Sequence, residues 1–501
     1  MEHYISIMKH TWKIVICCII FTGLKECQAA NLSFPGNFTI GVATSSYQIE
    51  GAWNVSDKAE SIWDWYTHSY PENIADGSNG DIACDSYHKY EEDIQWLKEL
   101  GVDFYRFSVS WARILPNGFA NEVSEDGLQY YKNLTQALID NGIEPVVTIY
   151  HWEHPKILED LGGWTNELMV TWYADYARII FEELGPLVKT FVTINEPESY
   201  CAVGYNTTYF APGKELENMG HYICMHNSLK AHATVYHMYD DEYRSTQNGQ
   251  IGIVAQCYGW VAGDNVTDDS IERYFQFNCG WVMHPIFVGD YPEIMKTRIA
   301  NISALQGYPF SRLPEFSDEW IEYINGTADF FGLNHYTSRM PVFDSNEDLG
   351  IYTIDSGIIA SINESWSLGS AAWLHVVPAG FGNLLRMIRD QYNNPPVWVL
   401  ENGYPDTGES DDYSRISYYY EYITELLTAF QDDGCNVVRY TIWSLLDEFE
   451  WTAGYTQLFG IVGVDFDSSD RTRSAKLSTA WWQEVISTRT LQSVPTANST
   501  R

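Results

Sequence analysis

Basic residues are scarce in this 501-residue sequence, which has 29 lysines and arginines against 67 aspartates and glutamates. The formal net charge of -38 repels nucleic-acid phosphates and anionic lipids, so we expect neither nucleic acid nor a membrane surface as a partner. Hydrophobic residues nevertheless make up 45% of the chain and charged ones only 19%. That balance provides for a large core and excludes a disordered acidic protein.

Long hydrophobic runs are missing as well, except near the N-terminus, where an apolar run at 14–24 follows two lysines and precedes small residues. The run is too short to cross a bilayer, so we predict a cleaved signal peptide at 1–29, with Met8 as an alternative start, and a secreted protein. Residues 489–501 are expected to form a C-terminal tail, which carries neither a retention signal nor a hydrophobic anchor.

Cysteines with the spacing of a zinc site are absent. Three of the nine cysteines lie in or beside the N-terminal run, and the six others are Cys84, Cys201, Cys224, Cys257, Cys279 and Cys435. An even number in a secreted chain permits disulfides, but the sequence does not show the pairing, and a chain of this size can also bury free thiols. Nothing in the sequence calls for a metal or a nucleotide, so we expect no cofactor.

Asparagines in N-x-S/T sequons are frequent, which favours N-glycosylation of a secreted chain. They include Asn54, Asn133, Asn206, Asn265, Asn301, Asn325 and Asn363. The sequence does not determine which of them are used, or whether the protein is a monomer or a homodimer.

Internal repeats, low-complexity blocks and linkers are also absent, which indicates one domain over 30–488. Short β-branched and aromatic runs alternate with longer segments, and apolar residues recur at helical spacing in 87–100 and 416–432, the second with Asp412 or Ser414 as its cap. Alternation of this kind predicts parallel βα units. The expected strands are 38–45, 103–111, 144–152, 190–196, 251–259, 329–337, 397–401 and 437–444.

Eight such units predict an α/β fold, a single-domain (β/α)8 TIM barrel, with a doubly wound sheet as the alternative. The residues at the strand ends decide between them, because buried parallel strands should be apolar throughout, yet nearly every expected strand finishes in polar or aromatic side chains. A barrel gathers all these ends at one mouth, whereas an open sheet gathers only a few at its switch point.

Two carboxylates stand out at strand ends, Glu196 after Thr193-Ile194-Asn195 and Glu401 after Val399-Leu400. Each alone is equally compatible with a structural ion pair. Together, on separate strands of one barrel, they suggest glycoside hydrolysis, in which one carboxyl attacks the sugar and the other transfers a proton. Aromatics at 15% of the chain also offer flat faces that stack on sugars, although most of them must belong to the core. Retention or inversion depends on the distance between the carboxyls, which a sequence cannot measure.

A series of motifs follows along 34–482. In order they are Phe34-Pro35-Gly36-Asn37-Phe38, Tyr47-Gln48-Ile49-Glu50-Gly51, Tyr105-Arg106-Phe107-Ser108, Tyr150-His151-Trp152, Asn195-Glu196-Pro197, Asn334-His335-Tyr336-Thr337, Glu401-Asn402-Gly403, Trp443-Ser444-Leu445 and Phe449-Glu450-Trp451. In these motifs and their order the sequence resembles glycoside hydrolase family 1, the family of β-glucosidases and myrosinases.

The resemblance implies a retaining mechanism, with Glu401 as nucleophile and Glu196 as acid/base. Arg106 and Tyr336 would keep Glu401 charged, and Asn195 would bind the sugar 2-hydroxyl. Further residues are implied as catalytic support or substrate contacts: Asn334, Gln48, His151, Trp152, Trp443, Glu450, Trp451 and Phe459. Family members for 6-phosphoglycosides have a small neutral residue in place of Glu450, so its carboxylate argues for an unphosphorylated sugar. His226 and His232 are interpreted as structural.

Three departures from the family pattern concern the leaving group: Glu153-His154, Glu448, and the residues around Gln457. We expect all three near the entrance of the site, and we expect Asp447 and Glu448 in a solvated loop. The leading hypothesis is hydrolysis of β-D-glucosides by a broad β-glycosidase.

The nearest alternative is thioglucoside hydrolysis, as in myrosinases. Plant myrosinases have Gln in place of the acid/base, so Glu196 argues against their mechanism but not against a thioglucosidase that keeps its acid. A sulfate site would need Lys or Arg near the leaving group, and the sequence does not place Lys214, Arg312 or Arg339 there. A remote alternative is a non-catalytic sugar-binding or receptor protein on the same fold, which would typically have lost one carboxylate.

Overall fold

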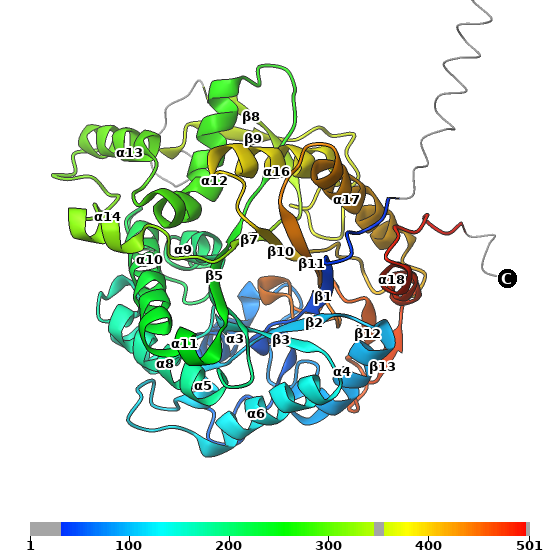
Figure 1. The fold of residues 1–501 in the computed structure, drawn as a ribbon. Coiled ribbons are helices and arrows are strands. Elements are labelled where there is room, and N and C mark those ends of the chain that lie inside the picture. The colour runs from blue at the N-terminus through cyan, green and yellow to red at the C-terminus, as the bar shows by residue number, and fades with distance from the viewer. Residues whose placement is uncertain (1–31, 345–354, 497–501) are drawn as a thin grey trace, which may run out of the picture.

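Eight parallel strands form a closed barrel at the centre of the molecule, and helices surround it (Figure 1). The computed structural model describes residues 32–344 and 355–496. The barrel strands, in their order around it, are β1 (Thr39–Ala43), β2 (Phe104–Ser108), β3 (Glu144–Tyr150), β4 (Thr190–Asn195), β5 (Gln250–Gln256), β7 (Phe331–Asn334), β10 (Val397–Asn402) and β11 (Val437–Trp443). β11 closes the barrel against β1 in parallel register, with Thr39 opposite Arg439 and Ala43 opposite Trp443.

The (β/α)8 barrel predicted from the sequence is therefore confirmed. Each expected strand overlaps one barrel strand, because β-branched and aromatic runs such as the TFVTIN of β4 are buried on both faces of a parallel sheet. The predicted signal peptide at 1–29 lies outside the described residues. In the described part of the chain no helix is long and apolar enough to cross a membrane.

The helices of the outer layer connect consecutive strands. The longer ones are α3 (Ile62–Ser69), α4 (Ser86–Leu100), α6 (Glu125–Asp140), α8 (Met169–Glu183), α9 (Pro197–Gly204), α10 (Gly220–Met238), α12 (Asp268–Val288), α13 (Glu293–Leu305), α14 (Asp318–Ile324), α16 (Ala379–Gln391), α17 (Tyr413–Gln431) and α18 (Leu477–Thr488). Short helical turns include α2 (Ser46–Ile49), α5 (Trp111–Ile114), α7 (Lys156–Asp160) and α11 (Arg244–Gln247).

The two helices predicted from periodicity are α4 and α17, each displaced from its expected bounds by no more than a turn. α4 ends at Gly101, whose left-handed φ of 72° suits glycine. Asp412 is the N-cap residue of α17, as expected, but its side chain binds the guanidinium of Arg415 and the hydroxyl of Ser478 instead of the helix N–H groups. Asp412 thus joins α17 to α18.

Two small sheets lie outside the barrel and were not predicted. One contains β6 (Gly259–Trp260), β8 (Ser338–Phe343) and β9 (Ile358–Ser361), and the other pairs β12 (Val462–Val464) with β13 (Arg473–Ala475). These strands are two to six residues long and lie within the long segments that follow barrel strands. Runs so short carry too little periodicity to be distinguished from loops.

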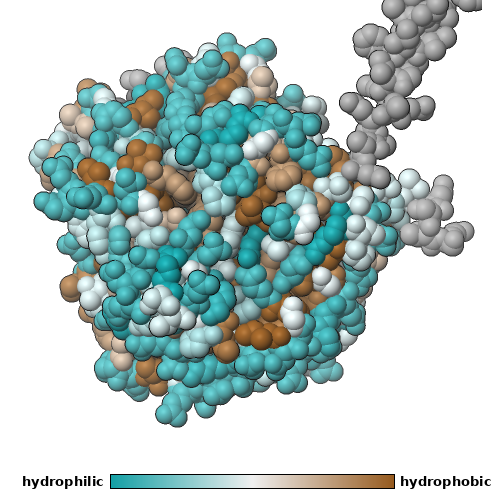
Figure 2. Space-filling model, viewed as in Figure 1, coloured by the Kyte–Doolittle hydropathy of each residue, from teal (hydrophilic) through white to brown (hydrophobic). Residues whose placement is uncertain are grey.

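The two ends of the described chain lie side by side, because residues 32–34 pair with 489–491 through two backbone hydrogen bonds of 2.9 and 2.8 Å. The first residues of the expected C-terminal tail therefore pack against the beginning of the domain. On the face that Figure 2 shows, hydrophilic side chains cover most of the surface, and hydrophobic ones form small separate patches, as the composition predicts.

Disulfides join Cys201 to Cys224 and Cys257 to Cys279, whereas Cys84 and Cys435 are buried thiols. The first bond links α9 to α10, and the second links the end of β5 to α12. Both types of cysteine that the sequence permitted are therefore present. Both bonds lie beside the carboxyl ends of the barrel strands.

Candidate active site

Polar side chains from five barrel strands meet at the carboxyl end of the barrel. Arg106 lies on β2, Asn195 ends β4, Asn334 ends β7, Glu401 lies on β10, and Trp443 ends β11. Parallel strands of a closed barrel deliver their ends to one mouth, which is why residues far apart in the sequence become neighbours here. Glycine is required beside Glu401, because a Cβ on Gly403 would lie 1.9 Å from the carbonyl oxygen of Trp443.

Glu401 is held by two donors. Nη1 of Arg106 donates to its Oε1 at 2.7 Å, and the Tyr336 hydroxyl donates to its Oε2 at 2.8 Å. The side chain is buried, with 3% of the residue exposed. Burial raises the pKa of Glu401, while Arg106, Tyr336 and the Asn334 amide oppose that rise. The site therefore contains one carboxyl whose charged form is directly compensated.

Glu196 follows β4 in a left-handed conformation, φ 43°, as the N-cap residue of α9, and Pro197 opens that helix. Its Oε1 accepts a hydrogen bond of 2.6 Å from Nδ2 of Asn334, and the residue is 4% exposed. The pKa of Glu196 lies well above its ordinary value because of burial, then the neighbouring charges of Glu401 and Glu198. Of the two carboxyls, Glu401 loses its proton first and Glu196 retains its own.

Asn195 links these groups to His151. Its Oδ1 accepts from Nη2 of Arg106 at 2.6 Å and from Nδ2 of Asn334 at 3.1 Å, so its own amide nitrogen is turned toward Nε2 of His151 at 3.1 Å. Burial and the charge of Arg106 lower the pKa of His151 well below its ordinary value, so the ring is neutral. Since Nε2 accepts, the proton is assigned to Nδ1, which has no partner among the described residues and can donate to a ligand.

Glu450 and Gln48 form a second polar pair. Nε2 of Gln48 donates to Glu450 Oε2 at 3.0 Å, while Oε1 of Gln48 accepts from the Ser45 hydroxyl at 2.6 Å. Burial, and then the charge of Glu401, raises the pKa of Glu450 to about 8. This carboxyl is consequently uncharged at neutral pH as long as Glu401 is ionised.

Aromatic rings enclose these polar groups. The ring centroids of Trp152 and Trp451 are 4.9 Å apart, and His151 lies parallel to Trp443 at 5.9 Å. The Tyr336 ring meets Phe459 edge to face at 5.9 Å. Flat aromatic walls with inward polar groups are suited to a sugar ring, which has apolar C–H faces and a polar rim.

The hollow at the barrel mouth consists of an inner and an outer pocket. The inner pocket is lined by His151, Trp152, Asn195, Glu196, Gln256, Tyr336, Trp373, Glu401, Trp443, Glu450, Trp451 and Phe459. The outer pocket, about 550 Å³, is lined by Trp152, Glu196, Glu198, Ser199, Ala202, Val203, Phe210, Gln256, Tyr258, Asn278, Trp373, Glu450, Trp451, Thr452, Ala453 and Gln457. Glu196 lines both pockets, whereas Glu401 lines only the inner one. In a ligand that occupies both pockets, the bond that joins its two parts would thus lie beside Glu196.

All thirteen side chains predicted for the site are brought together here. Ten of them line the inner pocket, and the remaining three, Gln48, Arg106 and Asn334, each donate a hydrogen bond to a lining carboxyl. Among residues 32–344 and 355–496, no group of three or more His, Cys, Asp or Glu side chains is placed to hold a metal ion.

Comparison with known proteins identifies the family. Residues 30–491 match the family model described as "Glycosyl hydrolase family 1". The chain belongs to glycosyl hydrolase family 1. It is 44% identical to Myrosinase 1 of Brevicoryne brassicae over 459 residues, covering 91% of this chain and 98% of that one, and 39% identical to the human cytosolic beta-glucosidase, covering 91% and 98%.

Solved structures of family 1 share the fold. The structure of aphid myrosinase superposes with a TM-score of 0.89 at 43% identity, covering 92% of this chain and 100% of that one. The rice Os3BGlu6 beta-glucosidase gives a TM-score of 0.85 at 34% identity, with coverage of 90% and 98%. The protein is therefore a family 1 glycoside hydrolase with the barrel of its relatives.

Several lining residues of this family 1 enzyme were missed from the sequence. Trp373 lies between β9 and α16, Phe210 between α9 and α10, and Tyr258 between β5 and β6. No motif marks them, because loops supply them, although Tyr258 stands near the end of the strand predicted at 251–259. Glu198 and Gln256 could have been found from the sequence, because Glu198 stands two residues after Glu196 and Gln256 lies in the strand predicted at 251–259, where it ends β5.

The expectation that the three departures from the family pattern lie at the entrance is correct only for Gln457, which lines the outer pocket. Glu153, His154 and Glu448 are buried away from it: Glu153 accepts a hydrogen bond from the Ser46 hydroxyl, and His154 contacts Tyr150 and Glu159.

The expected solvated loop at 447–448 is also wrong. Asp447 is buried and pairs with Nζ of Lys476 at 2.7 Å, and Glu448 is buried with its pKa well above its ordinary value because of burial and the neighbouring Glu450. The turn after β11 folds inward under the site, so these charged residues are covered.

The prediction that His232 is structural agrees with its place in the core. Its ring contacts the Thr193 hydroxyl at 2.7 Å and the Thr327 carbonyl at 2.7 Å, and burial lowers its pKa to about 3. His226 stacks on Phe316 with 4.3 Å between ring centroids, away from the two pockets.

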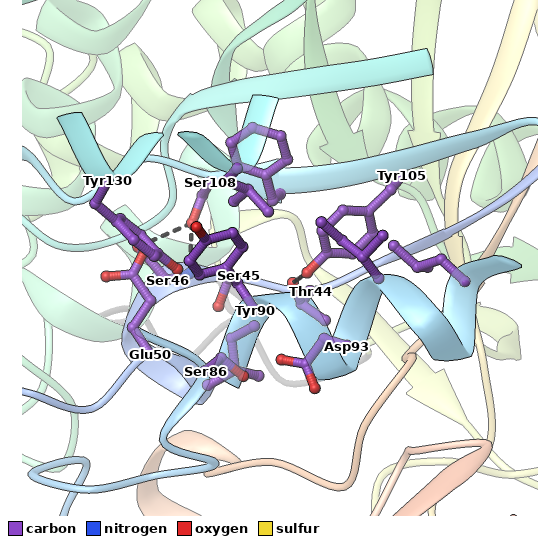
Figure 3. A pocket seen from close by; sticks show the side chains of 15 residues that line it. Thr44, Ser45, Ser46, Glu50, Ser86, Tyr90, Asp93, Tyr105, Ser108 and Tyr130 are labelled. Carbon is purple, nitrogen blue, oxygen red and sulfur yellow. Dashed lines mark hydrogen bonds between the residues drawn. The ribbon is translucent and has the colours of Figure 1, made fainter. Parts of the chain in front are cut away.

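A third cavity lies behind β1 and β2, facing α4 and α6 (Figure 3). Its wall is held by the Thr44–Tyr105 hydroxyl pair at 2.6 Å and by Ser108, whose hydroxyl accepts from the Ser46 amide at 2.7 Å. The cavity encloses only about 10 Å³, which is room for no more than a single water molecule. The residues around this cavity hold the turn that carries Gln48, and the cavity itself is too small for a substrate.

Proposed function

We propose that this family 1 enzyme is a retaining β-glucosidase that hydrolyses unphosphorylated β-D-glucosides, with Glu401 as nucleophile and Glu196 as acid/base. The observation that carries the proposal is the placement of the two carboxyls. Glu401 faces only the inner pocket and is compensated by Arg106 and Tyr336, whereas Glu196 lies where the inner pocket opens into the outer one and keeps its proton.

In the first step, a Glu401 oxygen attacks the anomeric carbon of the sugar in the inner pocket. The bond to the leaving group breaks, and Glu196 gives its proton to the departing oxygen. Once Glu401 is esterified it has no charge, so the pKa of Glu196 falls and its carboxylate can accept a proton from water. That water attacks the anomeric carbon, the ester bond breaks, and both carboxyls return to their original states.

Retention is supported by the position of Asn334, whose amide interacts with both carboxyls. Acceptor oxygens that share one amide nitrogen lie at most about two hydrogen-bond lengths, roughly 6 Å, apart. This limit admits the ~5–5.5 Å separation of retaining glycosidases and lies below the ~6.5–9.5 Å range of inverting ones. A rice beta-glucosidase among the relatives has been solved in a covalent complex with Glc, which is the type of intermediate that retention requires.

The preference for an unphosphorylated glucoside rests on Glu450. Its carboxyl lines the inner pocket beside Gln48, where it can bind sugar hydroxyls, whereas a phosphate there would find neither Lys nor Arg among the described residues that line this pocket. Trp443 and His151 provide the flat wall on the inner side.

Thioglucoside hydrolysis is the second candidate, favoured by the 44% identity to Myrosinase 1 of Brevicoryne brassicae. Against it stands the outer pocket, whose lining in the described part of the chain contains neither Lys, Arg nor His to bind a sulfate. Lys214 lies 3.9 Å from Glu159, Arg312 pairs with the buried Asp355, and the Arg339 guanidinium donates to the Trp373 carbonyl. None of the three cations is among the residues that line either pocket.

Secretion and N-glycosylation belong to the same proposal. Disulfides form and persist in oxidising compartments, so the two disulfides favour secretion. The asparagines of six sequons named above, all but the half-buried Asn206, are exposed. Expression in a secreting cell, followed by amidase digestion and mass measurement, tests both statements, and a product found only inside the cell and without glycans would contradict them.

A substrate panel tests the function. We expect turnover of aryl β-D-glucosides and cellobiose, weaker turnover of the matching galactoside and fucoside, and little or none of a glucosinolate. Glu401→Gln should abolish turnover of every substrate, because the amide cannot form the glycosyl ester. Turnover confined to the glucosinolate would replace the proposed substrate by a thioglucoside, and an active Glu401→Gln would remove the nucleophile assignment.

A further inference from the structure

Glu198 is a buried carboxyl in the wall of the outer pocket that the proposed mechanism does not use. It is the second residue of α9, two positions after Glu196, and only 5% of it is exposed. It lines the outer pocket but not the inner one. A group at this position faces the leaving group and not the sugar.

The two oxygens of Glu198 are in different situations. Oε1 accepts the backbone N–H of Gln256 at 2.6 Å, at the end of β5, and receives a longer contact of 3.5 Å from the Ser199 hydroxyl. Oε2 is buried and has no hydrogen-bond partner among the described residues. A buried carboxyl oxygen without a hydrogen-bond partner raises the free energy of the folded protein. A leaving group with a complementary polar atom would remove that cost.

Burial favours the neutral form of Glu198, and the titratable groups around it are mostly acidic. Burial raises the pKa of Glu198 to about 8. Glu196 on the same helix and Glu401 on β10 are acidic, and the Tyr258 hydroxyl after β5 also belongs to this group. The basic group beside Tyr258 is Arg339 on β8, which lies over the Tyr258 ring at 5.5 Å. Its Nη atoms donate to oxygens of Trp373, Thr337 and Ser338 and not to Glu198. Among residues 32–344 and 355–496, no cationic side chain forms an ion pair with Glu198.

We propose that Glu198 selects leaving groups by their charge. Its neutral carboxyl donates a hydrogen bond to an acceptor on an aromatic leaving group, and its carboxylate binds a cationic leaving group and rejects an anionic one. The aromatic walls Trp152, Phe210 and Trp373 then hold the ring of the leaving group. The substrate class is an aryl glucoside that is neutral or carries an amine. This inference rests on the proposed β-glucosidase function.

The experiment compares three phenyl β-D-glucosides that carry a carboxylate, a carboxamide or a trimethylammonium group at the para position. Their charges are constant from about pH 6 to about pH 9. The ratio of kcat/KM for the cationic substrate to that for the anionic one cancels the titration of Glu196 and Glu401, which both reactions share. In the wild-type enzyme we expect this ratio to rise about tenfold or more with pH, because ionised Glu198 attracts one substrate and repels the other.

Glu198→Gln keeps the acceptor for the Gln256 N–H and should reduce the rise of the ratio with pH to about twofold or less. Glu450 also lines the outer pocket, and its pKa is likewise raised to about 8, so the rise that remains in this variant measures the contribution of Glu450. The matched control is Glu91→Gln on the exposed side of α4, which removes one charge from the surface and should behave as the wild type. A wild-type ratio that does not change with pH overturns the proposal, and so does a Glu198→Gln ratio that rises as in the wild type.

Failure of the β-glucosidase function is distinguishable, because the carboxamide substrate would then not be turned over at all. Binding of the same glucosides, followed by tryptophan fluorescence, provides the ratio of affinities in that case. An affinity ratio that rises with pH in the wild type and not in Glu198→Gln supports the charge selection, and a constant ratio in both overturns it.

Discussion

At the scale of single residues, the proposed mechanism depends on two glutamates in unequal surroundings. Glu401 has a guanidinium and a phenol as direct partners, whereas Glu196 has the Asn334 amide. Burial raises the pKa of both, but Arg106 binds Glu401 directly and offsets the rise there, whereas its effect on Glu196 is the smallest of the causes. One barrel mouth thus holds a carboxylate and a carboxylic acid at the same pH, as general acid catalysis by one of them requires.

Replacement of the acid/base separates its two roles. Glu196→Ala should slow glucosides of poor leaving groups by about 10²–10⁴-fold and activated aryl glucosides far less in their first step, because only poor leaving groups need the proton. Azide, a small anion that needs no general base, should restore turnover of the activated substrate and leave β-glucosyl azide as product. Equal losses on both kinds of substrate, without rescue, would argue against acid/base duty for Glu196.

Tyr336 tests how the charge of Glu401 is maintained. Tyr336→Phe removes a 2.8 Å hydrogen bond to the carboxylate, and such bonds to charged groups contribute about 1.5–3 kcal/mol. We expect a roughly 10- to 150-fold loss in kcat/KM and a shift of the acidic limb of the pH profile to higher pH, since the pKa of Glu401 rises without this donor. A pH profile that keeps its acidic limb would show that Tyr336 acts only in packing.

Residue identity predicted the site well where the chemistry needs a particular functional group, and poorly where the surroundings decide the state of a side chain. Glu196 and Glu401 stand out as acids at the ends of apolar strands. Asp447 and Glu448 appear as ordinary acids beside a turn, yet the fold buries both. Burial depends on what packs above a residue, and here that is Lys476 and the segment around Glu450, which local sequence does not specify.

At the scale of elements, α9 joins the two pockets. Its N-cap is Glu196, its first turn contains Glu198, and Cys201 attaches it to α10. The second disulfide fixes Cys257, the residue after Gln256, whose N–H binds Glu198. The disulfides therefore brace the outer pocket on two sides.

Removal of one disulfide should be costly for stability. The Cys257–Cys279 bond closes a separation of 22 residues, for which the chain-entropy relation gives about 3 kcal/mol. We expect the Cys257→Ser, Cys279→Ser double variant to have a Tm lowered by several degrees relative to the wild type. Cys435→Ser, which changes a buried free thiol, is the control. A double variant no less stable than this control would show that the bond does not contribute to stability.

Strands of the barrel could be predicted because each is a run of β-branched and aromatic residues that is buried on both faces, such as Glu144–Tyr150 with the sequence EPVVTIY. The two small outer sheets could not, since strands of two to six residues in long loops depend on neighbours far away in the sequence. The outer pocket could not be predicted for the same reason, because its residues Phe210, Tyr258 and Trp373 lie in loops that only the folded chain brings together.

At the scale of the whole molecule, several buried carboxyls have a pKa higher in the folded enzyme than in the unfolded chain. The pKa of Glu153 is raised to about 7, and those of Glu198 and Glu450 to about 8, in each case chiefly by burial. The folded state then binds more protons than the unfolded state, so its stability is full below about pH 4.5 for these groups and falls as pH rises through 7 and 8. The net charge of -38 acts in the same direction.

Thermal unfolding measured from about pH 5 to about pH 9 should therefore show a Tm that falls with rising pH. Glu153→Gln should reduce the fall below about pH 8, because an amide at this position cannot ionise, while Glu91→Gln on the surface should leave the slope unchanged. A Tm that is constant or rises over this range would contradict the idea that these carboxyls are buried in their neutral form.

The sequence by itself predicted the barrel from its strands and the family from the order of its motifs, and through that resemblance the thirteen side chains that the fold gathers at the mouth. Those at strand ends come together because the closed order of strands brings the ends to one place. Only the tertiary structure decided that Glu196, and not Glu401, lines the outer pocket, which acids are buried, and which other residues line that pocket. Those properties depend on burial and on distances between segments that the chain brings close only when it folds, and a carboxyl acquires its protonation state from that environment.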